Sequence, residues 1–236
     1  MNKILKLSFT DFKLIFRDSS LKVFLALPII LFALVVFAVP YLADKYDFLV
    51  PYLPLILAFA VIENTQTFCF ISSMVLIDEK EADVAKIYGV VPLSKTEYIV
   101  SRFLIPYLFT LILNVILFTV QPFFDIGFGD NVLISMLAAL VVPVYVLSIN
   151  SIVRNRMQGM IYIKAFNMLI LLPIFAFFVP EKLKHLFGIF PTHWIFQSVE
   201  NATQGLPIGF MLTIGFIIFT GMFIYVSRSF IKNHFV

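Results

Sequence analysis

The chain has 236 residues, of which 61% are hydrophobic and 13% charged, and its mean hydropathy is +1.01. A soluble domain of this length could not bury so much apolar surface, which includes 29 Phe, so the composition indicates a membrane protein. The formal net charge of +3 is modest, and the single cysteine, Cys69, excludes a disulfide framework or a cysteine metal site within the chain.

Several apolar runs are long enough to cross a bilayer as helices, because about 20 residues span a hydrocarbon core of about 30 Å. The period-two alternation of a membrane barrel is absent. The expected fold is an all-α polytopic membrane protein whose single transmembrane domain covers residues 1–236. The six predicted spans are Leu21–Ala43, Val50–Ile77, Ser101–Phe124, Val132–Val153, Met157–Val179 and Pro207–Ser227.

Residues 1–19 are expected to form an amphipathic helix that lies in the inner membrane interface. On a helical wheel the apolar and basic side chains occupy separate sectors, Leu5, Phe9, Phe12 and Phe16 on one and Lys6, Lys13 and Arg17 on the other. A basic tail that only fixes topology would carry the same charges. No short apolar core with a small-residue cleavage site is present, so the first span is expected to stay in the mature protein.

Lysine and arginine are distributed unevenly between the two sides of the spans. With a cytoplasmic N-terminus, 13 fall on that side: Lys3, Lys6, Lys13, Arg17, Lys22, Lys80, Lys86, Lys95, Arg102, Arg154, Arg156, Arg228 and Lys232. The other side holds Lys45, Lys182 and Lys184. Because basic residues favour the cytoplasmic side, both termini and the segment 78–100 are expected to face the cytoplasm. These residues follow membrane edges and form no basic patch, so nucleic acid is not an expected partner.

A polar run, Glu63-Asn64-Thr65-Gln66, interrupts the second span. Glu63 precedes Asp78 by fifteen residues, which places it about 20 Å from the inner surface. A carboxylate at that depth is costly, so it is expected to face a cavity, be protonated or be hydrogen-bonded. Glu63, Asn64 and Gln66 are therefore candidates for a substrate path or for a helix contact at a dimer seam, and the residues alone support both.

Charges are concentrated in the segment 78–100. Asp78–Tyr88 is predicted to form a short helix that ends near Gly89, with Val84, Ile87 and Tyr88 on one face and Asp78, Glu79, Lys80, Glu81, Asp83 and Lys86 on the rest. Such a helix suits a contact with a cytoplasmic partner. A solvated connector whose charges only fix topology explains the same pattern equally well.

A second helix is predicted to start at Ser94 and to continue into the third span. Ser94-Lys95-Thr96-Glu97 has the pattern of a capping box, with Leu93 and Tyr98 at the positions of a hydrophobic staple, and Pro92 precedes it. The segment therefore reads as helix, sharp turn and helix, which is more local structure than a simple connection requires.

The later spans carry further signals. Pro28, Pro54, Pro106, Pro143 and Pro173 lie in spans one to five and are expected to kink or break them. Lys164 lies about 12 Å inside the fifth span, and its long side chain is expected to return to the interface. The outer segment 180–206 is expected to contain a short helix with Trp194 and Phe196 at the outer interface.

The charged segment resembles the membrane subunits of ABC-2 type exporters, in particular small drug-export permeases. The resemblance rests on Glu79-Lys80-Glu81 followed by Pro92-Leu93-Ser94-Lys95-Thr96-Glu97-Tyr98, within residues 72–103. Elsewhere it rests on topology: an interfacial helix, six spans, both termini inside and a long final outer segment. Members often have Gly-Thr after the acidic cluster, whereas this chain has Ala82-Asp83.

The resemblance implies a permease subunit of the bacterial plasma membrane that pairs as a homodimer or heterodimer on a separate ATPase subunit. The implied ATPase-coupling residues are Glu79, Lys80, Glu81, Val84, Ile87 and Tyr88, with Pro92, Ser94 and Glu97 forming the turn and the helix cap. No P-loop pattern is present, so the chain is not expected to be an enzyme or to hold a cofactor, and ATP and Mg would be used by the partner. An amphipathic or lipid-like substrate is expected. The alternative is a self-contained, proton-coupled transporter that uses Glu63.

Overall fold

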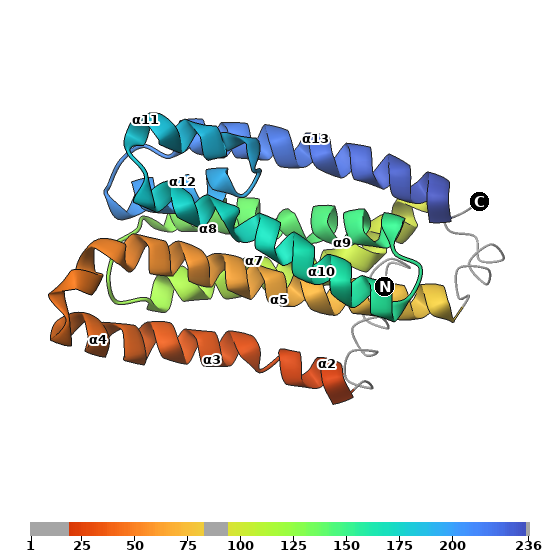
Figure 1. Cartoon of the computed structure of the whole chain (residues 1–236), viewed down its shortest axis with the longest axis horizontal. Helices are drawn as coiled ribbons and strands as arrows, with labels where there is room; N and C mark the ends of the chain where they lie inside the picture. Colours follow the sequence, from red (N-terminus) through yellow and green to blue (C-terminus); the bar gives the residue numbers. More distant parts are fainter. Residues whose placement is uncertain (1–18, 83–93, 235–236) are drawn as a thin grey trace.

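The computed structural model describes residues 19–82 and 94–234, which are mostly helical and, within these ranges, contain no strand. The helices form one elongated bundle (Figure 1). Six helical stretches of the described chain are long and apolar enough to cross a membrane, which confirms the all-α membrane fold: Leu21–Lys45, Asp47–Glu81, Glu97–Val120, Phe128–Ile152, Arg156–Phe178 and Gly209–Lys232. The interfacial helix predicted over residues 1–19 falls almost wholly outside the described residues.

Several spans are built from more than one helical segment. The first contains α2 (Ser19–Phe24), α3 (Leu27–Ala33), the π-helical η1 (Leu34–Ala38) and α4 (Val39–Lys45). The second and third are η2 (Asp47–Tyr52) with α5 (Leu53–Glu81), and α7 (Lys95–Val120). The fourth is α8 (Phe128–Ala139) with α9 (Val141–Ile152), and the fifth is α10 (Arg156–Leu171) with η3 (Leu172–Phe178). After α11 (Glu181–Lys184), η4 (His185–Ile189) and α12 (His193–Thr203), α13 (Gly209–His234) forms the sixth.

Four of the five predicted proline positions coincide with an interruption. Pro28 follows the break between α2 and α3, Pro143 follows the break between α8 and α9, and Pro173 lies where α10 gives way to η3. Proline removes a backbone donor and crowds the preceding turn, which explains these positions. Pro54 likewise follows the change from η2 to α5 and lies in the first turn of α5, where the missing donor costs little. Pro106 instead lies inside an uninterrupted α7.

The third span ends four residues before the predicted boundary at Phe124. Pro122 cannot continue the helix, and Gln121 forms the turn that follows Val120. The Gln121 side-chain oxygen accepts hydrogen bonds from the backbone N–H groups of Phe123 and Phe124 at 2.9 and 3.0 Å. An apolar run alone did not show this end, because Pro122, Phe123 and Phe124 continue the apolar run after Gln121.

α5 is the central helix of the bundle and packs against α7, α9, α10 and α12. The fourth span is the most enclosed, with 72% of its apolar stretch buried, whereas only 11% of that of the first span is buried, so the first span lies at the edge. At Gly159 of α10 an added Cβ would lie 2.5 Å from Ile77 Cδ1. The small residue therefore permits the close approach of α10 to α5, as is common between membrane helices.

The segment between the fifth and sixth spans folds back against the bundle. α12 packs against α5, α8 and α13, and the turn after it closes on Gly205, whose φ of 68° suits a glycine after a helix end (Figure 1). Phe196 is completely buried in this packing, so its predicted place at the outer interface is wrong, while Trp194 is partly exposed. The outer segment is thus part of the core at its end of the bundle.

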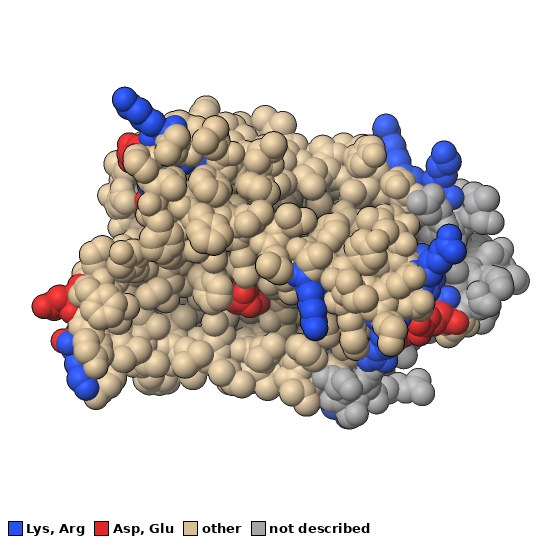
Figure 2. Space-filling view, in the orientation of Figure 1, with Lys and Arg blue, Asp and Glu red and all other residues tan. Residues whose placement is uncertain are grey.

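Most charged residues gather at the two ends of the bundle, and the surface between them is mainly apolar (Figure 2). One end carries the end of α5, the start of α10 and the end of α13, and its charged residues include Lys80, Arg102, Arg154, Arg156, Arg228 and Lys232. This end is called the basic end below. The opposite end carries Lys45 at the end of α4 and Lys182 and Lys184 in α11 (Figure 1).

Candidate functional site

The charged run Asp78–Glu81 forms the last turn of α5, and Ala82 is the C-cap that follows it. The predicted boundary between the second span and a separate charged helix at Asp78 is therefore not present, because no residue between Ile77 and Glu81 interrupts the helix. Val84, Ile87, Tyr88 and Pro92, which were predicted to take part in coupling, lie outside the described residues.

Glu79 forms a buried ion pair with α7. Its Oε1 lies 2.8 Å from the Arg102 Nη1, and the two side chains are 12% and 4% exposed, respectively. The Arg102 guanidinium also lies over the Tyr98 ring, 5.0 Å from its centroid. Because a buried charge is costly without a partner, this pair fixes the end of α5 against the start of α7.

Lys80 binds the C-terminal end of α9. Its Nζ donates hydrogen bonds to the backbone carbonyls of Val153 at 2.6 Å and Asn150 at 3.1 Å. The last carbonyls of a helix have no partner within it and carry partial negative charge, so an ammonium group stabilises them.

Glu81 binds the N-terminal end of α10. Its Oε1 accepts a hydrogen bond of 2.6 Å from the backbone N–H of Arg156, the first residue of that helix. The Arg156 side chain lies 3.5 Å from the Asp78 carboxylate, and Asn155 caps α10 by accepting from the N–H of Gln158 at 2.9 Å. A carboxylate at a helix N-terminus is favoured by the same end charges, with the opposite sign.

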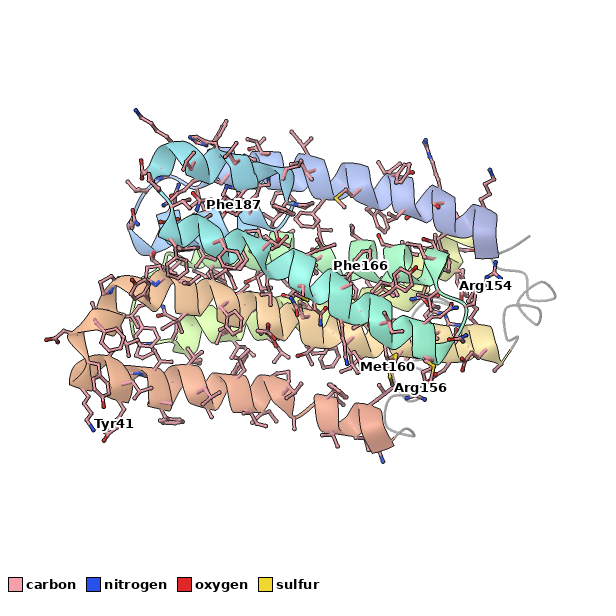
Figure 3. All side chains as sticks on the ribbon, in the orientation of Figure 1. Tyr41, Arg154, Arg156, Met160, Phe166 and Phe187 are labelled. Atoms are coloured by element: carbon pink, nitrogen blue, oxygen red, sulfur yellow. The ribbon has the colours of Figure 1, made fainter. Side chains whose placement is uncertain are left out.

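Three consecutive residues of α5 therefore contact three different helices, and we call this set, with Arg102 and Arg156, the α5 charge network. Lys80 and Glu81 have opposite signs and bind the two helix ends joined by the short turn 153–155. Arg154 is part of this turn and Arg156 directly follows it, both at the basic end (Figure 3). The sequence placed Glu79, Lys80 and Glu81 on a surface for a partner, whereas within the described chain they bind helices of the same chain.

The capping box predicted at the start of α7 is confirmed. The Ser94 Oγ accepts a hydrogen bond from the Glu97 N–H at 3.2 Å, and the Glu97 Oε2 accepts one from the Ser94 N–H at 2.8 Å. Both are exposed, while Tyr98 is buried. The helix that begins here continues without interruption to Val120, as predicted.

The polar residues of the second span divide between the core and the surface. Asn64 is fully buried and donates to the Asn114 Oδ1 at 2.6 Å, and Asn114 in turn donates to the Thr65 Oγ1 at 3.1 Å. This cluster joins α5 to α7. Gln66 donates to the backbone carbonyl of Asn167 on α10 at 3.4 Å. Asn64 and Gln66 are therefore helix-to-helix contacts within one chain.

Glu63 and Lys164 are the charged residues that lie in the interior of the described spans. Glu63 is half-buried, Lys164 is exposed, and no hydrogen bond or ion pair joins them. Figure 2 shows acidic and basic atoms within the apolar surface, away from both ends. α5 ends at the basic end and α10 starts there, and Gln66 bonds to Asn167 across them. Glu63 precedes Gln66 and Lys164 precedes Asn167, so Glu63 lies further from the basic end than Lys164. Within the described residues, no His, Cys, Asp and Glu group could hold a metal ion.

Comparison with known proteins identifies the family of this chain. A family model described as "Fluoroquinolones export permease protein Rv2686c-like" matches residues 11–227. The chain belongs to this family. Two relatives from Mycobacterium tuberculosis, the fluoroquinolones export permease proteins MT2760 (strain CDC 1551 / Oshkosh) and Rv2686c (strain ATCC 25618 / H37Rv), are each 26% identical over 167 residues. The match covers 69% of this chain and 66% of each relative, slightly less than two thirds of their length.

Membership of this export permease family confirms the resemblance to exporter membrane subunits. The matched region contains the whole of α5, the capping box and the α5 charge network. Arg102 and Arg156, which complete that network, were not singled out from the sequence. Their position beside the predicted membrane edge, at the same depth as the acidic residues that end the second span, could have indicated that they pair with those residues.

Proposed function

We propose that the chain is the membrane subunit of an ATP-driven ABC-2 type exporter in a bacterial plasma membrane, with the basic end and both termini in the cytoplasm. In this proposal two such chains, identical or related, pair on a separate ATPase that uses ATP and Mg. The substrate class is an amphipathic aromatic drug, as the names of the relatives suggest. Alternating exposure of the substrate path to the two sides of the membrane would move it outward.

The observation that carries the proposal is the α5 charge network. The segment 83–93 follows directly on a helix end that is held to α7 by Glu79, to α9 by Lys80 and to α10 by Glu81. A push on that segment would therefore act on three further helices together and not on α5 alone. A membrane subunit driven by an external motor requires such a link, whereas a connector that only returns the chain to the membrane does not.

Replacing Lys80 and Glu81 together by Met and Gln is expected to reduce ATP-dependent export about tenfold or more, because each lost charge-assisted bond contributes about 1.5–3 kcal/mol. Export of a fluoroquinolone from inverted vesicles that contain the chain and its ATPase measures this. The ATPase is expected to remain bound, since the two residues contact their own chain. Glu181→Gln with Lys182→Met is the matched control, an exposed pair at the opposite end. Unchanged export in the first variant contradicts the proposal.

A self-contained proton-coupled transporter is the second candidate, favoured by the half-buried Glu63, whose carboxylate forms no hydrogen bond or ion pair with the described residues. Glu63→Gln separates the two. The ATP-driven mechanism predicts that the variant keeps export within about a factor of two of the parent, since a neutral side chain of similar size removes no contact. Export that responds to a proton gradient without ATP, and that Glu63→Gln abolishes, would favour the carrier instead.

A further inference from the structure

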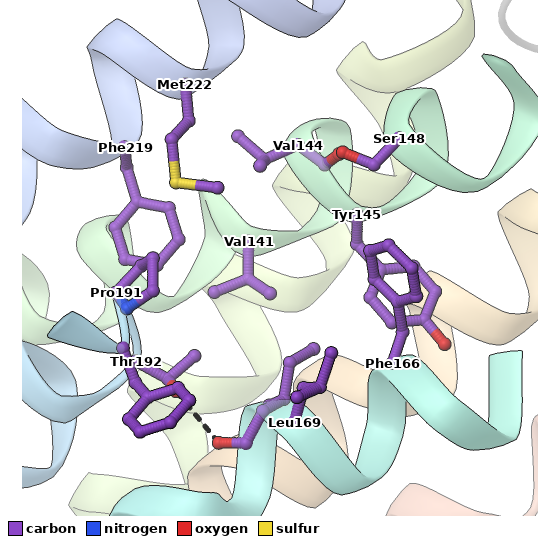
Figure 4. Close-up of a pocket in the computed structure, with 12 residues that line it drawn as sticks. Val141, Val144, Tyr145, Ser148, Phe166, Leu169, Pro191, Thr192, Phe219 and Met222 are labelled. Carbon is purple, nitrogen blue, oxygen red and sulfur yellow. Dashed lines mark hydrogen bonds between the residues drawn. The ribbon is translucent and has the colours of Figure 1, made fainter. Parts of the chain in front are cut away.

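A pocket of about 230 Å³ lies between α10 and α13, with α9 as its floor. Val141, Val144 and Tyr145 of α9 line the floor, Phe166 and Leu169 of α10 line one side, and Phe219 and Met222 of α13 line the other (Figure 4). α10 and α13 each pack against α9 but scarcely contact one another. The pocket is therefore half-open, and its mouth lies on the lateral surface of the bundle.

The lining offers no polar group to a ligand. The Thr192 hydroxyl donates to the carbonyl of Ile170 at 2.8 Å, as Figure 4 shows, and the Ser148 hydroxyl donates to the carbonyl of Val144 at 2.7 Å. The Tyr145 hydroxyl lies 2.5 Å from the Asn167 Oδ1, to which it donates. Every hydroxyl in the lining is thus already bonded inside the protein. A ligand with charged or strongly polar groups would lose hydration here without compensation.

The mouth opens at a depth where the surroundings are hydrocarbon. Phe166 and Ile170 lie ten and fourteen residues after Arg156, which corresponds to about 15–21 Å from the basic end at 1.5 Å per residue. That distance is near the middle of a hydrocarbon core of about 30 Å. Leu169 at the rim is 49% exposed and its neighbour Met168 is 72% exposed, as expected for side chains that face lipid.

We propose that this pocket binds one acyl chain of a bilayer lipid, which enters laterally between α10 and α13. An apolar cavity of about 150 Å³ stays free of water and accepts benzene, so a cavity of about 230 Å³ has room for a longer stretch of hydrocarbon. Acyl chains are the apolar groups present at this depth in every membrane. The bound chain fills the gap that the two helices leave and keeps α10 and α13 apart.

The inference does not depend on an ATPase or on export, so it is tested on the purified full-length chain in vesicles of phosphatidylethanolamine and phosphatidylglycerol. The probe is a phosphatidylethanolamine with a photoreactive diazirine at the middle of one acyl chain. We expect adducts on peptides that contain Val144–Ser148, Phe166–Ile170 or Phe219–Met222. Val144→Trp, which fills the pocket from its floor, is expected to reduce these adducts at least fivefold without lowering the melting temperature. Ser148→Phe, one turn further along α9, adds a large side chain at a second lining position and is expected to reduce the adducts as well.

Ile161→Trp is the matched control, because Ile161 lies on α10 and is 64% exposed but does not line the pocket. This variant is expected to leave the adducts unchanged. Adducts that persist in both pocket variants would overturn the proposal. So would labelling that naphthalene removes but excess unlabelled lipid does not, since that result would assign the pocket to a small aromatic molecule. Disulfide-linked dimers of a Leu169→Cys variant would also overturn it, because a second chain would then cover the mouth.

Discussion

Arg102→Ala is expected to destabilise the folded protein by about 3–5 kcal/mol, because it removes one partner of a buried ion pair and takes the guanidinium away from the Glu79 carboxylate. The variant also removes the cation that lies over the Tyr98 ring. The measurement is thermal unfolding of the purified chain in detergent, with the yield of folded protein as a second readout. α5 and α7 meet here, so the loss is expected to affect the whole bundle.

Arg228→Ala is the control for this result, because Arg228 lies at the same basic end but is exposed, and its removal is expected to change stability by less than about 0.5 kcal/mol. Glu79→Leu combined with Arg102→Met tests the electrostatic cause. Replacing both charges by apolar groups removes the buried carboxylate together with its Arg102 partner, so the double variant is expected to be more stable than Arg102→Ala. Equal stability of Arg102→Ala and Arg228→Ala would show that the ion pair contributes little.

Local signals in the sequence predicted the fold well. The long-range contacts of the α5 charge network, in contrast, could not be predicted. The capping box at Ser94 and Glu97 and the start of α7 depend on residues three apart, so the sequence contains all that defines them. The partners of Glu79, Lys80 and Glu81 lie on three other helices. Hydropathy predicts where a span lies along the chain but not which spans are neighbours, so these charges were assigned to a partner protein.

The sequence of the outer segment contained a signal for its burial, the helical spacing of apolar residues in α12, that was not used in the prediction. Ile195, Phe196, Val199 and Ala202 of α12 are buried, and their spacing is that of one helix face. The prediction that Phe196 lies at the interface treated an aromatic residue near a membrane edge as an interfacial anchor. The periodicity of α12 indicates a helix that packs its apolar face on other helices, and α5, α8 and α13 provide that surface.

Stability is expected to fall as the pH is lowered from about 6.5 to about 4, with His193 as a main cause. His193 lies at the start of α12 and is 3% exposed, and its Nδ1 has no hydrogen-bond partner among the described residues. The pKa of His193 is lowered to about 4, mainly by burial and also by the neighbouring His185 and Lys184, while Glu200 acts in the opposite direction. Lys184 and Glu200 are themselves paired at 2.8 Å between α11 and α12.

The direction of the effect follows from proton binding. Above pH 6.5 the imidazole is neutral in both the folded and the unfolded chain, so stability there does not depend on it. Between pH 6.5 and 4 the unfolded chain binds a proton that the folded chain does not. The free energy of unfolding therefore falls as the pH is lowered, by about 1.36 kcal/mol per pH unit and by up to about 3 kcal/mol in total.

Unfolding of the purified chain measured across this range is expected to show a shallower pH dependence in His193→Gln than in the parent. His185→Gln, at an exposed position, is expected to retain most of the dependence. Parallel profiles for the parent and His193→Gln would show that His193 becomes charged without cost, which would require α12 to open to water at that position.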